Sequence, residues 1–212
     1  MIFRSISRNA IILGAFALGT VAITAITNLL THEDIQINRQ QVLIDTIETL
    51  VEQDAYNNDL FNDCVLITAP QVGASAKHPV KAYLARHDDA PIAAFIQSIA
   101  PDGYSGAIRL TIGIYYDGTL AGVRVNEHKE TPGLGDKVEL KKSDWLLAFN
   151  GKSLSNPAPE KWKVKKDGGD FDQLTGATIT PRAVVKSVSN TLNYFTGNKE
   201  QLFSATTGCH DE

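Results

Sequence analysis

The sequence has few residues of the kinds that bind metals or iron–sulfur clusters. Its 212 residues include two cysteines, Cys64 and Cys209, and no Cys-x-x-Cys pair, which argues against iron–sulfur, zinc-ribbon and c-type haem sites. The histidines are scattered without metal-ligand spacing, and we expect surface or turn positions for them. They are His32, His78, His87, His128 and His210. We therefore predict no metal site.

The chain also lacks an excess of basic residues. Lys and Arg total 20 against 24 Asp and Glu, which gives a formal net charge of -4. Nucleic-acid-binding surfaces are normally basic, so we expect no nucleic-acid partner. One local group of lysines is interpreted as the solvated face of a strand with alternating charge. This group comprises Lys161, Lys163, Lys165 and Lys166.

Two glycine motifs fall short of nucleotide-binding signatures. Gly151-Lys152-Ser153 ends like a P-loop but lacks the glycine five positions earlier. Gly133-Leu134-Gly135 lacks the third glycine of a dinucleotide fingerprint and follows no strand–helix pattern. Neither segment is expected to bind a nucleotide.

Residues 9–31 form a long apolar run without a charged residue. As a helix it would extend about 34 Å at ~1.5 Å per residue, enough to cross a hydrocarbon core of roughly 30 Å. Arg4 and Arg8 precede the run, and Glu33 and Asp34 follow it. The positive-inside rule then predicts a cytoplasmic N-terminus and an exported remainder. The alternative is a cleaved signal peptide, which needs a shorter apolar core and an Ala-x-Ala-like site, neither clearly present.

The exported part contains short apolar runs separated by turn signals, which predict a mostly antiparallel sheet. The runs are residues 64–68, 80–86, 92–100, 107–115 and 119–126. In the fourth run apolar residues alternate, as a half-buried strand requires. Asp117-Gly118 is a strong hairpin signal between the last two runs. A further strand is expected over residues 162–165.

Helical signals flank these runs. Residues 35–53 have the spacing of an amphipathic helix, and Ser143 or Asp144 can cap a short helix ending near Phe149. Thr180 as N-cap and Pro181 at the first helical position would start the closing helix. Apolar residues fall on one face of that helix. They are Val184, Val185, Val188, Leu192 and Phe195.

These elements predict an α+β fold class with one exported domain. The expected organisation is a cytoplasmic N-terminus over residues 1–8, a transmembrane helix over 9–31, a linker helix over 32–55 and an extracytoplasmic domain over 56–212, whose antiparallel sheet is flanked by helices. Cys64 and Cys209 could pair in an exported domain, because disulfides persist there. Two unpaired thiols are equally compatible with the sequence.

The loop over residues 172–181 consists largely of small residues and leads into a helix start. Thr178 is expected just outside that helix, where free N–H groups and a partial positive charge would hold a phosphate beside its hydroxyl. Gly176 and Ala177 leave room for a bulky group. From these residues alone, a plain turn and helix cap remains the other interpretation.

The run Thr175-Gly176-Ala177-Thr178, preceded by Asp172, resembles the attachment motif of the FMN-binding domain family. In that family FMN is esterified through its phosphate to the last threonine. The resemblance implies a covalent phosphoester at Thr178, with Thr175, Gly176 and Ala177 around the phosphate. It also implies a flavin transferase that reads Asp172.

A second segment, Glu130-Thr131-Pro132-Gly133-Leu134-Gly135-Asp136, resembles the other signature of the same family. The resemblance implies that residues 130–135 lie against the flavin, with Leu134 as an apolar contact. It extends through residues 102–106 and 165–170, and so covers most of the chain after the first helical stretch.

Within the family the chain looks like the G subunits of Rnf-type (Rsx-type) ion-translocating electron transport complexes. This implies a flavoprotein relay anchored in the inner membrane, with a periplasmic domain, other membrane and redox subunits as partners, and no turnover alone. The C subunit of the sodium-translocating NADH:quinone reductase, which carries the same kind of flavin, is the nearest alternative. A non-redox membrane-anchored binding or assembly module is the other.

Overall fold

The computed structural model describes residues 2–205 and 208–209, and the side chains of residues 2–5, 32–40 and 53 lie outside this description. His210 and the side chains of Arg4, His32, Glu33 and Asp34 are therefore outside the described part. The chain divides into two compact units, Met1–Asp45 and Thr46–Glu212. The predicted domain bounds stay predictions.

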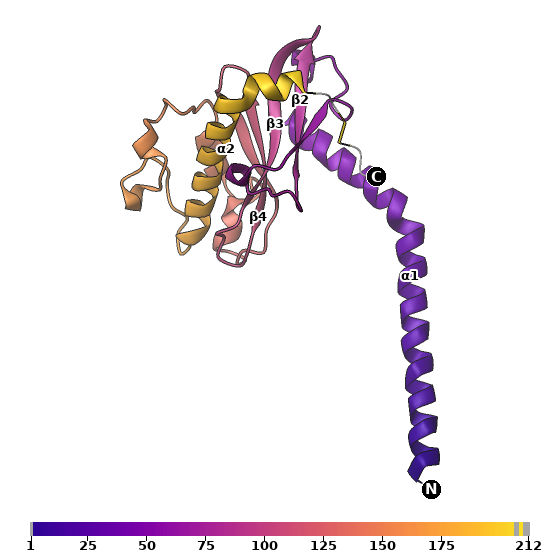
Figure 1. Ribbon diagram of the computed structural model, residues 1–212. Coiled ribbons are helices and arrows are strands. Elements are labelled where there is room, and N and C mark those ends of the chain that lie inside the picture. The colour runs from indigo at the N-terminus through magenta and orange to yellow at the C-terminus, as the bar shows by residue number, and fades with distance from the viewer. Residues whose placement is uncertain (1, 206–207, 210–212) are drawn as a thin grey trace. The chain divides into compact units, whose positions relative to one another are not determined.

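The first unit contains all but the last three residues of helix α1, Ile2–Glu48 (Figure 1). Its segment Ile6–Thr31 is 26 residues long with a mean hydropathy of 2.2, which makes it long and apolar enough to cross a membrane. Threonine hydroxyls in this segment donate to carbonyls three or four residues earlier, at 2.8 to 3.0 Å for Thr20, Thr24 and Thr27. The helix itself therefore satisfies these polar groups.

The amphipathic helix expected over residues 35–53 is the last part of α1 and ends at Glu48 rather than Gln53. The N–H groups of Leu50 and Val51 both donate to the carbonyl of Ile47, which closes a turn. Ile47, Leu50 and Val51 are all buried. Apolar residues at the end of the predicted helix are therefore buried, but the helix ends five residues earlier than predicted.

The second unit contains one five-stranded sheet in the order β1-β2-β3-β4-β5, with every neighbouring pair antiparallel. The strands are Cys64–Ile67, Val80–His87, Ala90–Ala100, Ile108–Tyr115 and Leu120–Glu127. All five predicted runs are therefore strands. At the predicted hairpin the Gly118 N–H donates to the Tyr115 carbonyl at 2.8 Å. The predicted α+β class and antiparallel sheet are confirmed.

Helix α2, Ile179–Ser204, lies across one face of the sheet (Figure 1). The predicted apolar face of this helix is buried in one cluster with residues of β2, β3 and β4. Val184, Val188, Leu192 and Phe195 are all fully buried. This packing fixes the start of α2, and with it Thr178, relative to the sheet.

Residues 128–178 form turns and short 3₁₀ helices instead of strands. These helices are η3 Gly135–Val138, η4 Asp144–Phe149, η5 Pro159–Lys161 and η6 Lys165–Asp167. The predicted short helix is η4, and the Ser143 hydroxyl caps it by accepting from the Trp145 N–H. The predicted strand over residues 162–165 is wrong. Only a single bridge pairs Val164 with Phe171, because the intervening residues turn back tightly.

The lysines of this segment do not form a strand face. Lys165 pairs with Asp172 at 2.6 Å, and Lys161 donates to the Gly168 carbonyl at 3.1 Å. Their positions follow the turn, which corrects the expected alternating face.

Cys64 and Cys209 form a disulfide in the structure, with Cα atoms 5.6 Å apart. Both side chains are buried. The Gly208 N–H also donates to the Cys64 carbonyl at 2.9 Å. The tail is thus joined to β1, the edge strand of the sheet.

Candidate functional site

The two motif segments predicted from the sequence meet at one pocket of about 370 Å³. The pocket is lined by Tyr104, Glu130, Thr131, Leu134, Gly135, Gly176, Ala177, Thr178, Ile179 and Thr180. Of the predicted site residues, Pro132, Gly133 and Thr175 do not line it. The structure therefore brings the Glu130 and Thr178 segments together although about fifty positions separate them.

A turn places the Thr178 segment in the pocket. The Ala177 N–H donates to the Leu174 carbonyl at 3.0 Å, and Gly176 has φ of 81°, a conformation that favours glycine. A Cβ at Gly176 would lie 2.8 Å from Leu134 Cδ2. The missing side chain therefore lets Leu134 of the Glu130 segment pack directly over the turn.

Thr178 is the N-cap residue of α2, and its side chain makes no capping hydrogen bond. The prediction that Thr180 is the N-cap with Pro181 at the first helical position is wrong by two residues, because the helix already begins at Ile179. Pro181 still falls in the first turn, where its missing N–H breaks no helical hydrogen bond. The half-buried Thr178 hydroxyl is thus directly at the helix N-terminus.

Thr180, predicted as the N-cap, bonds to the Glu130 segment instead. Its hydroxyl donates to Oε2 of Glu130, and both side chains are buried. The other carboxylate oxygen, Oε1, accepts from the Ser105 N–H at 3.0 Å. A Cβ at Gly135 would lie 2.8 Å from Thr180 Oγ1. Glu130 therefore joins three segments at the pocket, and glycine is required beside it.

A network of charged side chains follows Glu130 in the chain. Lys142 contacts Asp136 and Glu139, each at 2.9 Å. A backbone hydrogen bond at Gly133 lowers the pKa of Asp136, and the Lys142 amine lowers it further. The hydrogen bond from Lys142 is also the main cause of the lowered pKa of Glu139. This network holds the end of the Glu130 segment in place.

His128 belongs to the same network. Its Nδ1 accepts from the Glu130 N–H at 3.0 Å, and its Nε2 lies 2.7 Å from Glu139 Oε1. Because Nδ1 accepts, Nε2 must carry the hydrogen and donate to Glu139. His128 is thus largely enclosed, with a side chain 11% exposed, whereas His78 and His87 are exposed as predicted. The expectation of a simple surface or turn residue was wrong for His128.

Three residues that line the pocket were not predicted from the sequence: Tyr104, Ile179 and Thr180. Tyr104 lies in the matching segment 102–106, so its position next to a strand start was an available signal. Ile179 is a large apolar residue directly after the attachment motif. The Thr180 partner had no such signal, since Glu130 is 50 positions away.

Comparisons with known proteins cover both units. The RnfG N-terminal region matches residues 1–50, and the FMN-binding domain matches residues 103–193, which include the whole pocket. The G subunit of the ion-translocating oxidoreductase complex of Pseudoalteromonas atlantica is 47% identical over 98% of this chain and 96% of its own length. The chain belongs to this family of G subunits. The member from Shewanella amazonensis is 46% identical over 97% of this chain and 95% of its own.

Two solved structures resemble the chain more distantly. Shewanella oneidensis NqrC matches 73% of this chain and 75% of its own, with 22% identity and a TM-score of 0.47. The C subunit of the Na(+)-translocating NADH-quinone reductase from Parabacteroides distasonis matches 67% of this chain and 77% of its own, with 19% identity and a TM-score of 0.45. Matches this distant carry no argument about the site.

Proposed function

We propose that this chain is a flavin-carrying electron-relay subunit of a membrane-bound, ion-translocating complex, with FMN joined by a phosphoester to Thr178. One observation carries the proposal. The Thr178 hydroxyl stands at the N-terminus of α2, inside the pocket that both motif segments line, and makes no capping bond. Membership of the G-subunit family and the FMN-binding domain match support the flavin and the complex.

The residues present fit FMN. The pocket volume of about 370 Å³ falls within the roughly 300–1,000 Å³ of small-molecule sites. A phosphate on Thr178 would lie at the positive end of the α2 dipole, and the first turn contains no acidic residue to oppose it. Leu134 and Ile179 offer apolar surface for a ring system.

Each residue then has a separate task. Bound flavin supplies the electron transfer, while Thr178 holds the cofactor by its tail. Gly176 lets Leu134 pack over the turn before Thr178, and Glu130 joins the facing segments. The Asp172 side chain is 70% exposed and paired with Lys165, and so lies open to a flavin transferase. No residue of the chain is assigned as a catalytic acid or base.

The same proposal places the chain in the membrane. The apolar part of α1 serves as a single-pass anchor, and the flanking charges favour a cytoplasmic N-terminus with a periplasmic domain. A disulfide between Cys64 and Cys209 fits an oxidising compartment. Protease added to spheroplasts should digest the domain, whereas protection of the domain would reverse the orientation.

Two alternatives remain to be separated from this proposal. The C subunit of the sodium-translocating quinone reductase is disfavoured by full-length similarity to G subunits at 42–48% identity. Electron transfer within a purified complex containing the chain would separate the two. A non-redox binding or assembly module predicts no attached flavin.

The linkage is tested by denaturing the exported full-length chain and following flavin fluorescence with the polypeptide. We expect fluorescence to stay with wild type and with Thr178→Ser, which keeps a hydroxyl, and to vanish in Thr178→Ala. Flavin that washes off the denatured wild type, or that persists in Thr178→Ala, contradicts the linkage. A chain without any flavin would favour the non-redox module.

A further inference from the structure

The loop Asp102–Gly106, here named the tyrosine loop, carries an exposed aromatic side chain at the pocket. Tyr104 is 66% exposed and lines the pocket that contains Thr178. Among the described residues from Thr46 onward, the exposed large apolar side chains are Leu66, Tyr104, Leu134, Leu147 and Ile179. Three of these line this one pocket. Apolar exposure is thus concentrated where the cofactor would lie.

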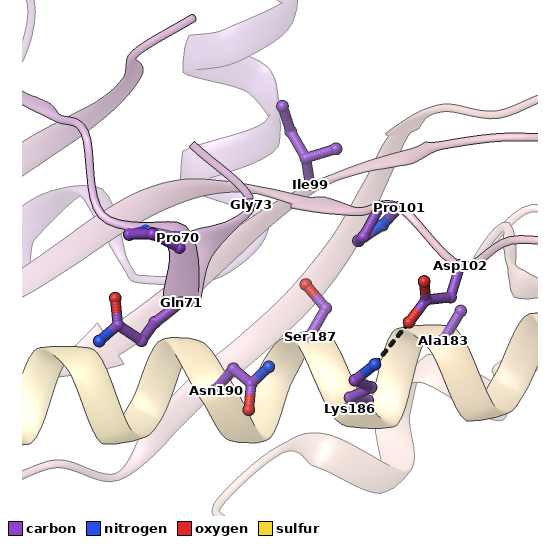
Figure 2. Close-up of a pocket in the computed structure, with 10 residues that line it drawn as sticks. All are labelled: Pro70, Gln71, Gly73, Ile99, Pro101, Asp102, Ala183, Lys186, Ser187 and Asn190. Carbon is purple, nitrogen blue, oxygen red and sulfur yellow. Dashed lines mark hydrogen bonds and ion pairs between the residues drawn. The ribbon is translucent and has the colours of Figure 1, made fainter. Parts of the chain in front are cut away.

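The tyrosine loop is held on both sides of Tyr104. On one side, the Lys186 amine of α2 contacts the Asp102 carboxylate at 2.5 Å, across a small cavity of about 160 Å³ (Figure 2). On the other side, the Ser105 N–H donates to buried Glu130. The Asp102–Lys186 pair is largely exposed, so Glu130 is the stronger of the two anchors.

Close packing at Gly103 fixes the loop further. A Cβ at this position would lie 2.2 Å from the Gly106 carbonyl oxygen and 3.0 Å from Glu130 Oε1. The loop is therefore folded tightly on itself and on Glu130. Its tip residue projects from a rigid base instead of a long flexible segment.

The Tyr104 side chain itself has no partner within the described part of the protein. Within the described part of the chain it makes no hydrogen bond and no ring contact, whereas Tyr116 packs against the Phe203 ring and the Lys199 amine. An exposed aromatic side chain on an anchored loop can bury its face against a ligand without the cost of ordering the loop backbone.

We propose that Tyr104 packs on one face of the FMN isoalloxazine and shields that face from solvent, with Asp102, Lys186 and Glu130 acting as positioning residues for its loop. The proposal rests on the proposed function, because it takes the flavin at Thr178 as its ligand. It assigns Tyr104 a direct contact with the cofactor ring. The other ring face is left for electron exchange.

The test is collisional quenching of flavin fluorescence by iodide in the folded, full-length protein. Tyr104→Ala should raise the quenching constant roughly twofold, because it opens one of the two ring faces. Tyr104→Phe retains the ring and should stay near wild type. Leu147→Ala removes an exposed apolar side chain outside the pocket and is the matched control, with no change expected.

Substitution of a positioning residue should change the iodide quenching constant by a smaller amount. Lys186→Ala should raise the quenching constant less than Tyr104→Ala does, and Lys186→Arg should restore it. Unfolding midpoints of all variants identify any that are simply misfolded. A change in quenching at an unchanged midpoint is expected for a positioning role.

Different results would contradict the Tyr104 contact and the covalent linkage at Thr178. An unchanged quenching constant in Tyr104→Ala, with flavin still attached after denaturation, overturns the Tyr104 contact alone. Flavin that is bound in the folded protein but released on denaturation overturns the linkage, and the iodide comparison still decides the contact. A purified chain that binds no flavin overturns both.

Discussion

The sheet and the segment that follows it are stabilised in different ways. Residues 64–127 form five strands with a continuous ladder of backbone hydrogen bonds. Residues 128–178 form turns and short 3₁₀ helices. Their centre is a group of aromatic rings, in which the ring centroid of Phe149 lies 4.7 Å from that of Phe171 and 6.3 Å from that of Trp162. The sheet and α2 supply a rigid frame, while most of the pocket comes from loops that side chains hold in place.

Truncating a central ring on each side tests whether the two regions are equally well anchored. Phe149→Ala and Phe95→Ala each remove a fully buried ring and should each lower the free energy of unfolding by about 3–5 kcal/mol. Denaturant unfolding of the full-length protein in detergent measures both. A loss below about 1 kcal/mol for Phe149→Ala would show that the irregular segment contributes little to the fold.

Reduction of the disulfide should have the next largest effect, on the sheet side of the comparison. Loss of the Cys64–Cys209 bond should destabilise the second unit by about 2–4 kcal/mol, chiefly by freeing the unfolded chain. The double variant Cys64→Ser with Cys209→Ser should not respond to reductant. Two free thiols per denatured, unreduced chain would disprove the pairing.

Glycine substitutions separate close packing in the irregular segment from helix propensity. Gly135→Ala places a Cβ 2.8 Å from Thr180 Oγ1 and should lower the free energy of unfolding by about 1–3 kcal/mol. Gly197→Ala, in open space on α2, should raise it by up to about 1 kcal/mol. Equal effects in the unfolding curves would refute tight packing at Gly135.

The smallest effect expected is a pH dependence of the charged network. The lowered pKa values of Asp136 and Glu139 stabilise the fold above the unfolded pKa of about 4, and this contribution is lost as pH falls through the folded pKa. Lys142→Ala should therefore flatten the decrease in stability between about pH 5 and pH 3. The neighbouring Lys141→Ala should leave it unchanged, and equal flattening would discount the Lys142 contacts.

The strands and helices could be predicted because their apolar residues recur with a fixed period. Residues 107–115 alternate with the period of a strand, and Asp117-Gly118 supplies the positive φ that the hairpin needs, with 93° at Gly118. The five strands and the apolar face of α2 follow from such patterns. The two motif segments were predicted to share a site through family resemblance, and the structure places them at one pocket.

The remainder depends on contacts that leave no local pattern. Trp162 and Val164 alternate with lysines as in a strand, and both are buried. A Cβ at Gly169 would nevertheless lie 1.9 Å from the Lys163 carbonyl oxygen, so the chain folds back instead of extending. Thr180 has the residue type of an N-cap, but its hydroxyl serves Glu130. His128 is enclosed by partners on another turn.

The position of the Cys64–Cys209 bond in the sequence also determines when during synthesis it can form. One partner lies in the first strand of the sheet and the other lies beyond α2, 145 positions later. The link can therefore close only after all five strands, the pocket segments and α2 have been synthesised. In an exported domain, closure would mark a chain whose flavin-bearing part has completely left the cytoplasm.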